Sequence, residues 1–345
     1  MINLKNLRSK KVGVLGLEKT GLSVIKAVQQ AGGLLICWDD DKHKRDNLTV
    51  DGITVRDLND KNIIMELDLL VVSPGVPHLY PEAHPIVTMA YELNIRVDND
   101  IGLFFSNHVQ EEYEAFGDPP KIIAITGSNG KSTATALTNH VLSKFFCDVE
   151  MGGNIGKPVL ELSPLKEGSI RIIELSSYQI ELAKCLAPNL AAFINFSPDH
   201  LQRHGGLGGY FYAKARLFLE NLTDVSVINI DTAEGLFLFQ RLNTVENKMI
   251  AISSKLNIKN YLWAVGLNGS FITEWKKGRQ VYSFDLRNLG NSFHGLWESV
   301  LTVYALARSF GIAPKSILTK CSGFVPLAHR SQWVDEIKGV AFIND

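Results

Sequence analysis

The chain of 345 residues has few cysteines and no long apolar run. Its four cysteines are widely scattered and match neither a zinc-site nor a disulfide spacing. No apolar stretch approaches the roughly 20 residues that a membrane-spanning helix needs, and the N-terminus lacks the apolar core and cleavage site of a signal peptide. These absences argue against a disulfide-stapled secreted domain and a helical membrane protein. We expect a reduced, cytoplasmic protein.

The chain also lacks an excess of charge of either sign. Its formal net charge is −1, with 21% charged and 46% hydrophobic residues, which is typical of a globular protein. This balance gives no electrostatic basis for binding nucleic acid or an anionic membrane, so we expect neither as a partner. The length is enough for two or three domains, each with its own core.

The most informative stretch, residues 121–146, reads KIIAITGSNGKSTATALTNHVLSKFF. An apolar run predicts a buried strand, a glycine-containing loop follows, and apolar residues at helical spacing come next. This order predicts a phosphate-binding loop for ATP or GTP, in which loop N–H groups and the helix N-terminus contact the anion. Its residues are consecutive: Gly127, Ser128, Asn129, Gly130, Lys131, Ser132 and Thr133.

Within this loop, Lys131 would reach the outer phosphates, and the hydroxyl of Ser132 or Thr133 would bind Mg²⁺. Ile125 stands where the usual spacing has a glycine, so the loop is a shortened variant. The simpler alternative is a glycine turn that begins an amphipathic helix. The ordered combination of strand, loop and helix disfavours it.

Before this loop, strands alternate with helices over about the first 110 residues. Strands are predicted at Lys11–Leu15, Leu34–Trp38, Leu69–Val72 and 95–97, a spacing typical of a parallel, Rossmann-like sheet. The G-x-G-x-x-G fingerprint of dinucleotide enzymes is absent. Ligands on such sheets bind at the carboxyl ends of the strands. Five residues fall there: Thr20, Asp39, Ser73, Pro74 and Gly75. For any one of them, a purely turn-forming role is an equal alternative.

A second α/β unit begins with the strand before the phosphate loop. Glu174 ends a strand predicted at 169–175, and Asp199-His200 follow one predicted at 190–196. Both strands deliver these side chains to the sheet edge that carries the loop, where a carboxylate can bind Mg²⁺. Lys214 lies in a helix predicted over 208–221, and its simplest interpretation is a solvated surface charge.

The predicted fold is therefore α/β, with a Rossmann-like N-terminal domain followed by a P-loop-type ATP-binding α/β domain. The first domain covers residues 1–110 and the second covers 121–343. The polar segment 111–120, which ends in Pro-Pro, is a predicted linker. Short strands and hairpins are predicted over 249–286.

These segments together resemble the Mur ligases of peptidoglycan synthesis across the whole chain. The resemblance rests on ordered motifs: ITGSNGKST (125–133), GGNIG (152–156), ELSSYQ (174–179), Asp199-His200 and YAKARLF around Lys214. Three further segments resemble the branch of the family that adds D-glutamate: GLEKTGLS (16–23), VVSPGV (71–76) and DNDIGLF (98–104). Each motif is short, but their joint order is specific.

The resemblance implies an ATP-dependent ligase that joins D-glutamate to UDP-N-acetylmuramoyl-L-alanine through an acyl phosphate. Lys131 would bind the ATP phosphates, while Ser132 and Glu174 would ligate one Mg²⁺. His200 and a carbamylated Lys214 would hold a second Mg²⁺, since a carbamate offers the oxygen ligands that this ion prefers.

The other roles are also implied by the resemblance. The UDP moiety would bind the first domain through Thr20, Asp39, Ser73, Pro74 and Gly75. Asn154 would contact the nucleotide-sugar substrate or phosphate, and His329 and Arg330 would contact ATP. We expect the chain to be a monomer.

Two features depart from the family pattern. Segment 291–299 lacks the two asparagines with which the family contacts adenine and ribose. The family also has a third domain of about 100 residues. Residues 344–345 would then begin its hinge, and this chain would bind the UDP substrate but ligate poorly or not at all.

Three alternatives remain at the level of sequence. They are another Mur or folylpolyglutamate-type ligase, an NAD-dependent dehydrogenase, and a non-catalytic nucleotide-sugar-binding protein.

Overall fold

The computed structural model describes residues 1–48, 53–111, 113, 115–220, 223–243, 248–289, 293 and 295–325, and the backbone of 332–337 and 340–344. The strands of its two main sheets fall on either side of the segment 111–120. In the described part of the chain, no helix has the length and apolarity needed to cross a membrane. The observed α/β class confirms the predicted one.

The first sheet is fully parallel and has the strand order β3-β2-β1-β4-β5. Its strands are β1 (Lys11–Leu15), β2 (Leu34–Trp38), β3 (Thr54–Val55), β4 (Leu69–Val72) and β5 (Arg96–Asp98). The helices of this part are α1 (Lys19–Gln30), α2 (Lys42–Asp46), α3 (Lys61–Ile64), α4 (Pro85–Glu92) and α5 (Asp100–Gln110), after a 3-10 turn η1 (Lys5–Leu7). The four strands predicted here are confirmed, to within one residue at β5.

The second sheet has nine strands in the order β14-β13-β12-β11-β10-β9-β6-β8-β7. Its strands are β6 (Lys121–Thr126), β7 (Val149–Gly153), β8 (Ile170–Glu174), β9 (Leu190–Phe193), β10 (Val225–Asn229), β11 (Lys248–Ser253), β12 (Trp263–Asn268), β13 (Phe271–Lys276) and β14 (Arg279–Asp285). Strands β6 to β12 pair in parallel, and β13 and β14 add an antiparallel hairpin at one edge. A separate hairpin joins β15 (Gln332–Ile337) to β16 (Val340–Asn344).

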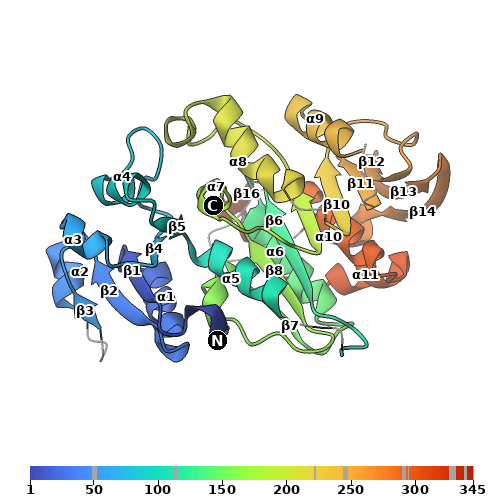
Figure 1. Cartoon of the computed structure of the whole chain (residues 1–345). Helices are drawn as coiled ribbons and strands as arrows, with labels where there is room; N and C mark the ends of the chain where they lie inside the picture. The colour runs from blue at the N-terminus through green and yellow to red at the C-terminus, as the bar shows by residue number, and fades with distance from the viewer. Residues whose placement is uncertain are drawn as a thin grey trace.

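Helices cover both faces of the second sheet, as Figure 1 shows. They are α6 (Lys131–Leu142), α7 (Ser177–Leu182), α8 (Leu207–Leu219), α9 (Ala233–Leu242), α10 (Trp297–Ser309) and α11 (Pro314–Cys321), with 3-10 turns η2 (Val159–Glu161), η3 (Leu201–His204) and η4 (Leu286–Leu289). The continuous apolar run of β6 follows from this coverage, because both faces of the strand are buried. Ile122 and Ala124 pack into the cluster that includes α8 residues, while Ile123 and Ile125 pack into the cluster that includes α6 and α10 residues.

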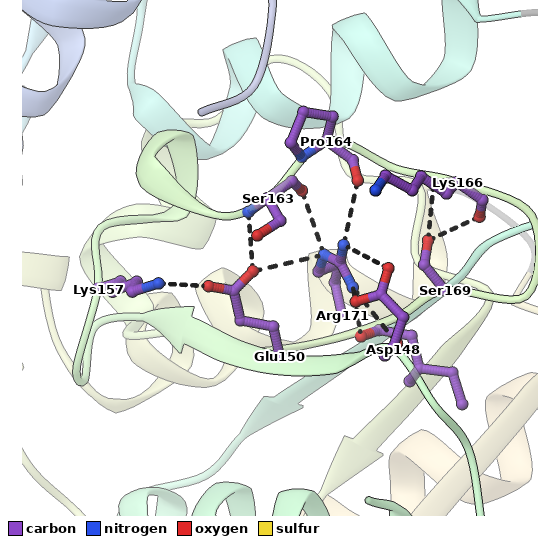
Figure 2. A network of polar contacts seen from close by, with 9 residues as sticks. Asp148, Glu150, Lys157, Ser163, Pro164, Lys166, Ser169 and Arg171 are labelled. Atoms are coloured by element: carbon purple, nitrogen blue, oxygen red, sulfur yellow. Dashed lines mark hydrogen bonds and ion pairs between the residues drawn. The ribbon is translucent and has the colours of Figure 1, made fainter.

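The connection from β7 to β8 is held by a buried arginine (Figure 2). Arg171, fully buried on β8, donates hydrogen bonds to the Asp148 carboxylate at 3.0 and 3.2 Å and to the carbonyl oxygens of Ser163 and Pro164. The Glu150 carboxylate accepts from the Ser163 N–H at 2.8 Å and from Lys157 at 2.6 Å. Since a buried cation needs such partners, this network fixes the path of residues 154–166.

That connection also touches the first sheet's helices. The α1 and α5 helices both contact η2, and the Ile2 N–H donates to the Leu160 carbonyl at 2.9 Å. At the end of β5, the buried Asn99 donates from Nδ2 to the Gln179 carbonyl of α7 at 2.8 Å. Helices α1 and α5 and the end of β5 therefore contact the second part of the chain through η2 and α7.

Candidate functional site

The phosphate loop lies between β6 and α6, as the sequence predicts. Gly130 caps the helix in the left-handed region at φ 72°, a conformation that favours glycine. Gly127 has no room for a side chain, because a Cβ there would meet Ile194 Cγ1 at 2.4 Å. Lys131 is the first helical residue, and its Nζ donates to the Ser128 carbonyl at 2.9 Å. The side chain of Lys131 thus folds back onto the loop.

Asn195 organises this loop, and the sequence gave no indication of it. Its Oδ1 accepts the backbone N–H groups of Ser128 at 3.0 Å and Asn129 at 2.9 Å. Its Nδ2 donates to the Asn129 carbonyl at 3.1 Å and to Glu298 Oε2 at 2.6 Å. The predicted strand 190–196 includes Asn195, whereas β9 ends at Phe193. Asn195 therefore lies two residues beyond the strand, where its side chain reaches the loop.

Ser128 ties the loop to helix α8. Its Oγ donates to the Ser197 carbonyl at 2.8 Å and lies 3.1 Å from the Tyr210 hydroxyl. Asn129 Nδ2 donates to Ser197 Oγ at 3.1 Å. These contacts bring the loop, the residues after β9 and α8 together at one edge of the sheet.

Glu174 ends β8 beside the loop and has one carboxylate oxygen without a partner. Its Oε1 accepts from Asn154 Nδ2 at 2.9 Å. Its Oε2 is buried and forms no hydrogen bond with any of the described residues. An orphaned buried carboxylate oxygen is suited to a divalent cation, which prefers oxygen ligands.

The metal ligands proposed from the resemblance do not form a compact acidic or histidine cluster. Among the residues that the structure describes, no group of three or more His, Cys, Asp and Glu side chains is placed to hold a metal ion. The only carboxylate among them is Glu174; the others are Ser132, His200 and the unmodified amine of Lys214. A lysine ammonium cannot ligate a cation, so this ligand set depends on a chemical change at Lys214.

Lys214 is buried, which overturns its interpretation as a solvated surface charge. It is a residue of α8 and is only 1% exposed. Nζ donates to the Gly127 carbonyl at 2.8 Å and lies 4.6 Å from the centroid of the Tyr210 ring. The pKa of Lys214 is lowered to about 7, chiefly by burial and also by the charge of Lys131, while Asp199 opposes the shift. At neutral pH a large fraction of this amine is uncharged.

His200 lies on an exposed turn near the loop. Its backbone is left-handed at φ 50°, its side chain is 49% exposed, and Nε2 is 3.3 Å from Asp199 Oδ2. The ring is 5.1 Å from that of Tyr178. This exposure leaves the imidazole accessible from solvent.

A second histidine, His204, is buried nearby, and the sequence did not single it out. Its Nδ1 lies 2.9 Å from Glu181 Oε1 and its Nε2 lies 2.9 Å from Ser177 Oγ. Glu181 also lies 3.1 Å from His78 of the first part of the chain. Burial raises the pKa of Glu181, but hydrogen bonds with His204 and His78 outweigh it and lower this pKa to about 2. The group joins α7 and η3 to the turn after β4.

The six residues predicted to bind the nucleotide-sugar all line one cavity of about 460 Å³. They are Thr20, Asp39, Ser73, Pro74, Gly75 and Asn154. Thr20 lies in the first turn of α1, Asp39 follows β2, Ser73-Pro74-Gly75 follow β4, and Asn154 follows β7 of the second sheet. Gly153, Gly156 and Gln179 also line the cavity, so it is bounded by both sheets.

Several of these residues also shape turns. The Asp39 carboxylate accepts the N–H groups of Leu17 at 2.8 Å and Asp41 at 3.0 Å. Ser73 Oγ donates to the Gly16 carbonyl at 3.0 Å. The turn-forming role and the cavity-lining position therefore coexist.

Two cationic side chains on this cavity were absent from the sequence prediction. Lys19 Nζ donates to the Gly156 carbonyl at 2.5 Å, across the two sheets. Lys44 contacts Glu18 at 2.7 Å and lies 3.8 Å from Asp39 Oδ2. Both line the cavity, where an ammonium group can neutralise a diphosphate.

The ATP contacts predicted at His329 and Arg330 lie outside the described residues, as does most of 290–294. Glu298 is described: it lies in the first turn of α10, where it accepts the Asn195 amide.

Comparison with known proteins places these features in a family. Residues 125–289 match the Mur ligase middle domain. The chain is 43% identical to the UDP-N-acetylmuramoylalanine--D-glutamate ligase of Cereibacter sphaeroides, over 100% of this chain and 75% of the relative. The enzyme of the same name from Ruegeria pomeroyi is 42% identical over the same shares.

Solved structures of Mur-type ligases share the fold at low sequence identity. One is the UDP-N-acetylmuramate:L-alanyl-gamma-D-glutamyl-meso-diaminopimelate ligase from Neisseria meningitides, with a TM-score of 0.56 and 15% identity, covering 92% of this chain and 99% of that chain. Another is the UDP-N-acetylmuramate-alanine ligase from Thermotoga maritima, with a TM-score of 0.51 and 17% identity, covering 97% of this chain and 74% of that chain.

Proposed function

Because this chain belongs to the Mur ligase family, we propose that it carries the nucleotide-sugar and ATP sites of a ligase that adds D-glutamate to UDP-N-acetylmuramoyl-L-alanine. In this reaction ATP phosphorylates the alanine carboxylate, and the amine of D-glutamate displaces phosphate from the resulting acyl phosphate to form the amide. Such ATP-dependent catalysis relies on positioning and on charge neutralisation.

The observation that carries the proposal is the hydrogen bond between Asn154 and Glu174. Asn154 lines the cavity that holds the six predicted substrate residues, and Glu174 ends the strand beside the phosphate loop. A nucleotide-sugar in the cavity would direct its alanine carboxylate toward this pair. The γ-phosphate of ATP would approach the same point from the loop.

The phosphate end of the site would be built by the loop and Lys131. Backbone N–H groups at the start of α6 would bind the phosphate oxygens, and Lys131 would neutralise their charge once it exchanges the Ser128 carbonyl for phosphate. Asn195 would hold the loop in this shape, because its Oδ1 accepts the N–H groups of Ser128 and Asn129.

Magnesium would supply charge neutralisation at the transferred phosphate. The orphaned Glu174 Oε2, with the Ser132 hydroxyl, fits one such ion. For a second ion, we propose that Lys214 reacts with CO₂ to form a carbamate and acts with His200. The neutral amine that burial favours is the form that can attack CO₂.

The nucleotide-sugar end would be held by the first sheet. Thr20 and Ser73-Pro74-Gly75 would contact the UDP moiety at the cavity wall. Lys19 and Lys44 would neutralise the diphosphate, in keeping with the preference of phosphates for ammonium groups. Asp39 would keep one acceptor position on each carboxylate oxygen for the nucleotide-sugar, because each oxygen accepts only one backbone N–H group.

Calorimetric titration with UDP-N-acetylmuramoyl-L-alanine tests the proposal, with UDP-N-acetylmuramic acid as the comparison ligand. We expect binding that strengthens with the alanine, and about three- to tenfold weaker binding in Thr20→Ala if the hydroxyl contacts UDP. Thr319→Ala, on the distant helix α11, is the matched control and should bind normally. Binding of ATP with Mg²⁺ but of neither nucleotide-sugar would contradict the proposal and favour another type of amide ligase.

A further inference from the structure

A cavity of about 1070 Å³ lies at the edge of the second sheet where the β13–β14 hairpin is attached. It is lined by residues of α9 and of strands β11 to β14 and by the loop before β12. None of its lining residues belongs to the phosphate loop or to the cavity at the first sheet. It is therefore a separate feature that the proposed ligase reaction does not use.

Three of its side chains form a row across adjacent strands. Trp263 on β12 is directly opposite Lys276 on β13, and Lys276 is directly opposite Arg279 on β14. Opposed residues of antiparallel strands share a face, so the three project together. The Lys276 ammonium lies 3.9 Å from the centroid of a Trp263 ring. An aromatic surface and two cations are thus adjacent.

The hairpin turn adds a third cation to this row. Lys277 and Gly278 connect β13 to β14 with φ angles of 51° and 77°, the left-handed pair of a two-residue turn. Asn or Asp is the usual first residue of such a turn. A lysine there keeps positive charge at the tip of the hairpin.

The positive charge of this cavity is poorly compensated. Lys248, Lys276, Lys277 and Arg279 line it, and none of the described residues that line it carries a carboxylate. Within the described ranges, no acidic side chain pairs with Lys248, Lys277 or Arg279. Lys276 lies 3.8 Å from Glu274.

Glu274 offers that lysine little, because its carboxylate is already engaged. It is buried and accepts hydrogen bonds from Arg308 and Tyr304 at 2.8 Å and from Trp263 Nε1 at 3.0 Å. The four cations of the cavity are therefore available to an anion.

The remaining walls suit a heterocyclic base. Tyr261 packs edge-on against Phe239 at 5.2 Å, which holds its ring in place. Gln240, Asn243 and Asn260 supply primary amides, each with donors and an acceptor. Aromatic rings stack on bases, and amides pair with their polar edges.

We propose that this cavity binds a nucleoside phosphate. Lys276, Lys277 and Arg279 hold the phosphate groups, and the base packs against the aromatic wall of Tyr261 and Trp263. A cavity with cations, amides and rings together fits a small organic phosphate better than an extended anionic surface.

Photolabelling with 8-azidoadenosine 5′-diphosphate in the absence of metal tests this site on the full 345-residue chain. Labelled peptides are mapped by mass spectrometry in the wild type, in Lys276→Glu/Arg279→Glu, and in Lys315→Glu/Lys320→Glu. The last variant makes the same change in charge at two exposed lysines of α11. Matching far-UV circular dichroism spectra and urea-unfolding midpoints of the three proteins report that each is folded.

We expect label within 248–279 in the wild type and in the α11 variant, and at least tenfold less in Lys276→Glu/Arg279→Glu, since hydrogen bonds to charged groups dominate phosphate binding. Absence of label from 248–279 in the wild type would overturn the proposal. Equal labelling of 248–279 in all three proteins would also overturn it.

Discussion

At the scale of single residues, Lys214 combines a buried position with a chemically reactive group. Its amine contacts only the Gly127 carbonyl and the Tyr210 ring among the described residues. Burial lowers its pKa from 10.5 to about 7. Between these two pH values the unfolded chain binds more protons at this lysine than the folded chain does. Lys214 therefore makes the free energy of unfolding rise with pH in that window.

The same shift predicts when Lys214 reacts with CO₂. Because the amine loses its proton as the pH rises through about 7, carbamate formation at fixed dissolved CO₂ should be several-fold greater at pH 8 than at pH 6. ¹³C NMR with labelled bicarbonate measures the carbamate. The signal should be absent from Lys214→Ala, and an undiminished signal in that variant would assign the carbamate to another amine.

Asn195 predicts a separate effect on ATP. Asn195→Ala removes the side-chain acceptor of the Asn129 N–H and leaves the Ser128 N–H only the residue 195 carbonyl at 3.3 Å, so the preformed shape of the loop is weakened. We expect ATP with Mg²⁺ to bind about tenfold more weakly, in line with a loss of about 1.4 kcal/mol when one neutral hydrogen bond is removed and a second is weakened. Calorimetry with a non-hydrolysable ATP analogue measures this.

The control for that variant is Asn257→Ala, on an exposed loop, which should bind ATP normally. The nucleotide-sugar affinity of Asn195→Ala should also stay unchanged, because Asn195 does not line the cavity at the first sheet. Unaltered ATP binding in Asn195→Ala would mean that the loop holds its shape without this side chain.

At the scale of secondary-structure elements, the N-terminus of α5 contains a buried carboxyl group. Asp100 is the first residue of α5, is 1% exposed, and has one oxygen without a hydrogen bond to the described residues. Burial raises its pKa to about 7, hydrogen bonds from its own N–H and that of Ile101 oppose the shift, and Asp98 adds to it. The folded chain therefore binds a proton here that the unfolded chain releases above about pH 4.

The unfolding free energy of Asp100→Asn should increase relative to that of the wild type as the pH rises from about 4 to about 7. In that window the wild type loses the stability of its protonated, buried carboxyl group, whereas the amide does not titrate. The difference in unfolding free energy should grow by at most about 4 kcal/mol. Urea denaturation at pH 4.5 and 7.5 measures it. The exposed Asp46→Asn should show no such trend, and a flat difference for Asp100→Asn would mean that this carboxyl is ionised throughout.

Strand ends were the most predictable part of the site. In a parallel sheet they share one edge, so an apolar run followed by polar residues indicates the location of a ligand. Thr20, Asp39 and Ser73 meet in one cavity for this reason. Asn195 was missed because the apolar run predicts a strand over 190–196, which includes it. The structure ends β9 at Phe193, so Asn195 belongs to the turn that contacts the phosphate loop.

Helix faces were less predictable than strand ends. Lys214 has the spacing of an ordinary helical residue, and its burial depends on the loop and Tyr210 lying against α8. The cavity at β12–β14 could not be predicted either, because the row of Trp263, Lys276 and Arg279 requires the register of three strands. Both features come from tertiary pairing, which a local pattern does not contain.

At the scale of the whole molecule, one side chain reaches from the second part of the chain to the cavity turn of the first. Arg203 of η3 donates to the carbonyl oxygens of Gly75 and Val76 at 3.3 and 3.4 Å, and its guanidinium lies 4.7 Å from the centroid of the Tyr178 ring. Arg203 does not line the cavity. It therefore contacts the backbone of the turn without forming part of the cavity wall.

Arg203→Ala should therefore weaken UDP-N-acetylmuramoyl-L-alanine binding about threefold, because the Ser73–Gly75 turn loses its contact with η3. Affinity for ATP should not change. Calorimetry measures both, and Arg287→Ala, which removes an exposed arginine paired with Asp285, should alter neither. A loss of ATP affinity in Arg203→Ala would indicate general damage instead of a local effect on the turn.

The cavity of about 460 Å³ exists only while the two sheets are in contact, because Thr20 and Ser73 come from one and Asn154 and Gly156 from the other. A nucleotide-sugar bound there contributes part of its binding free energy to keeping the sheets together. By thermodynamic linkage, each increment of ligand binding is an equal increment of cohesion between the two halves. The free energy needed to separate the two sheets should therefore rise with the concentration of the nucleotide-sugar.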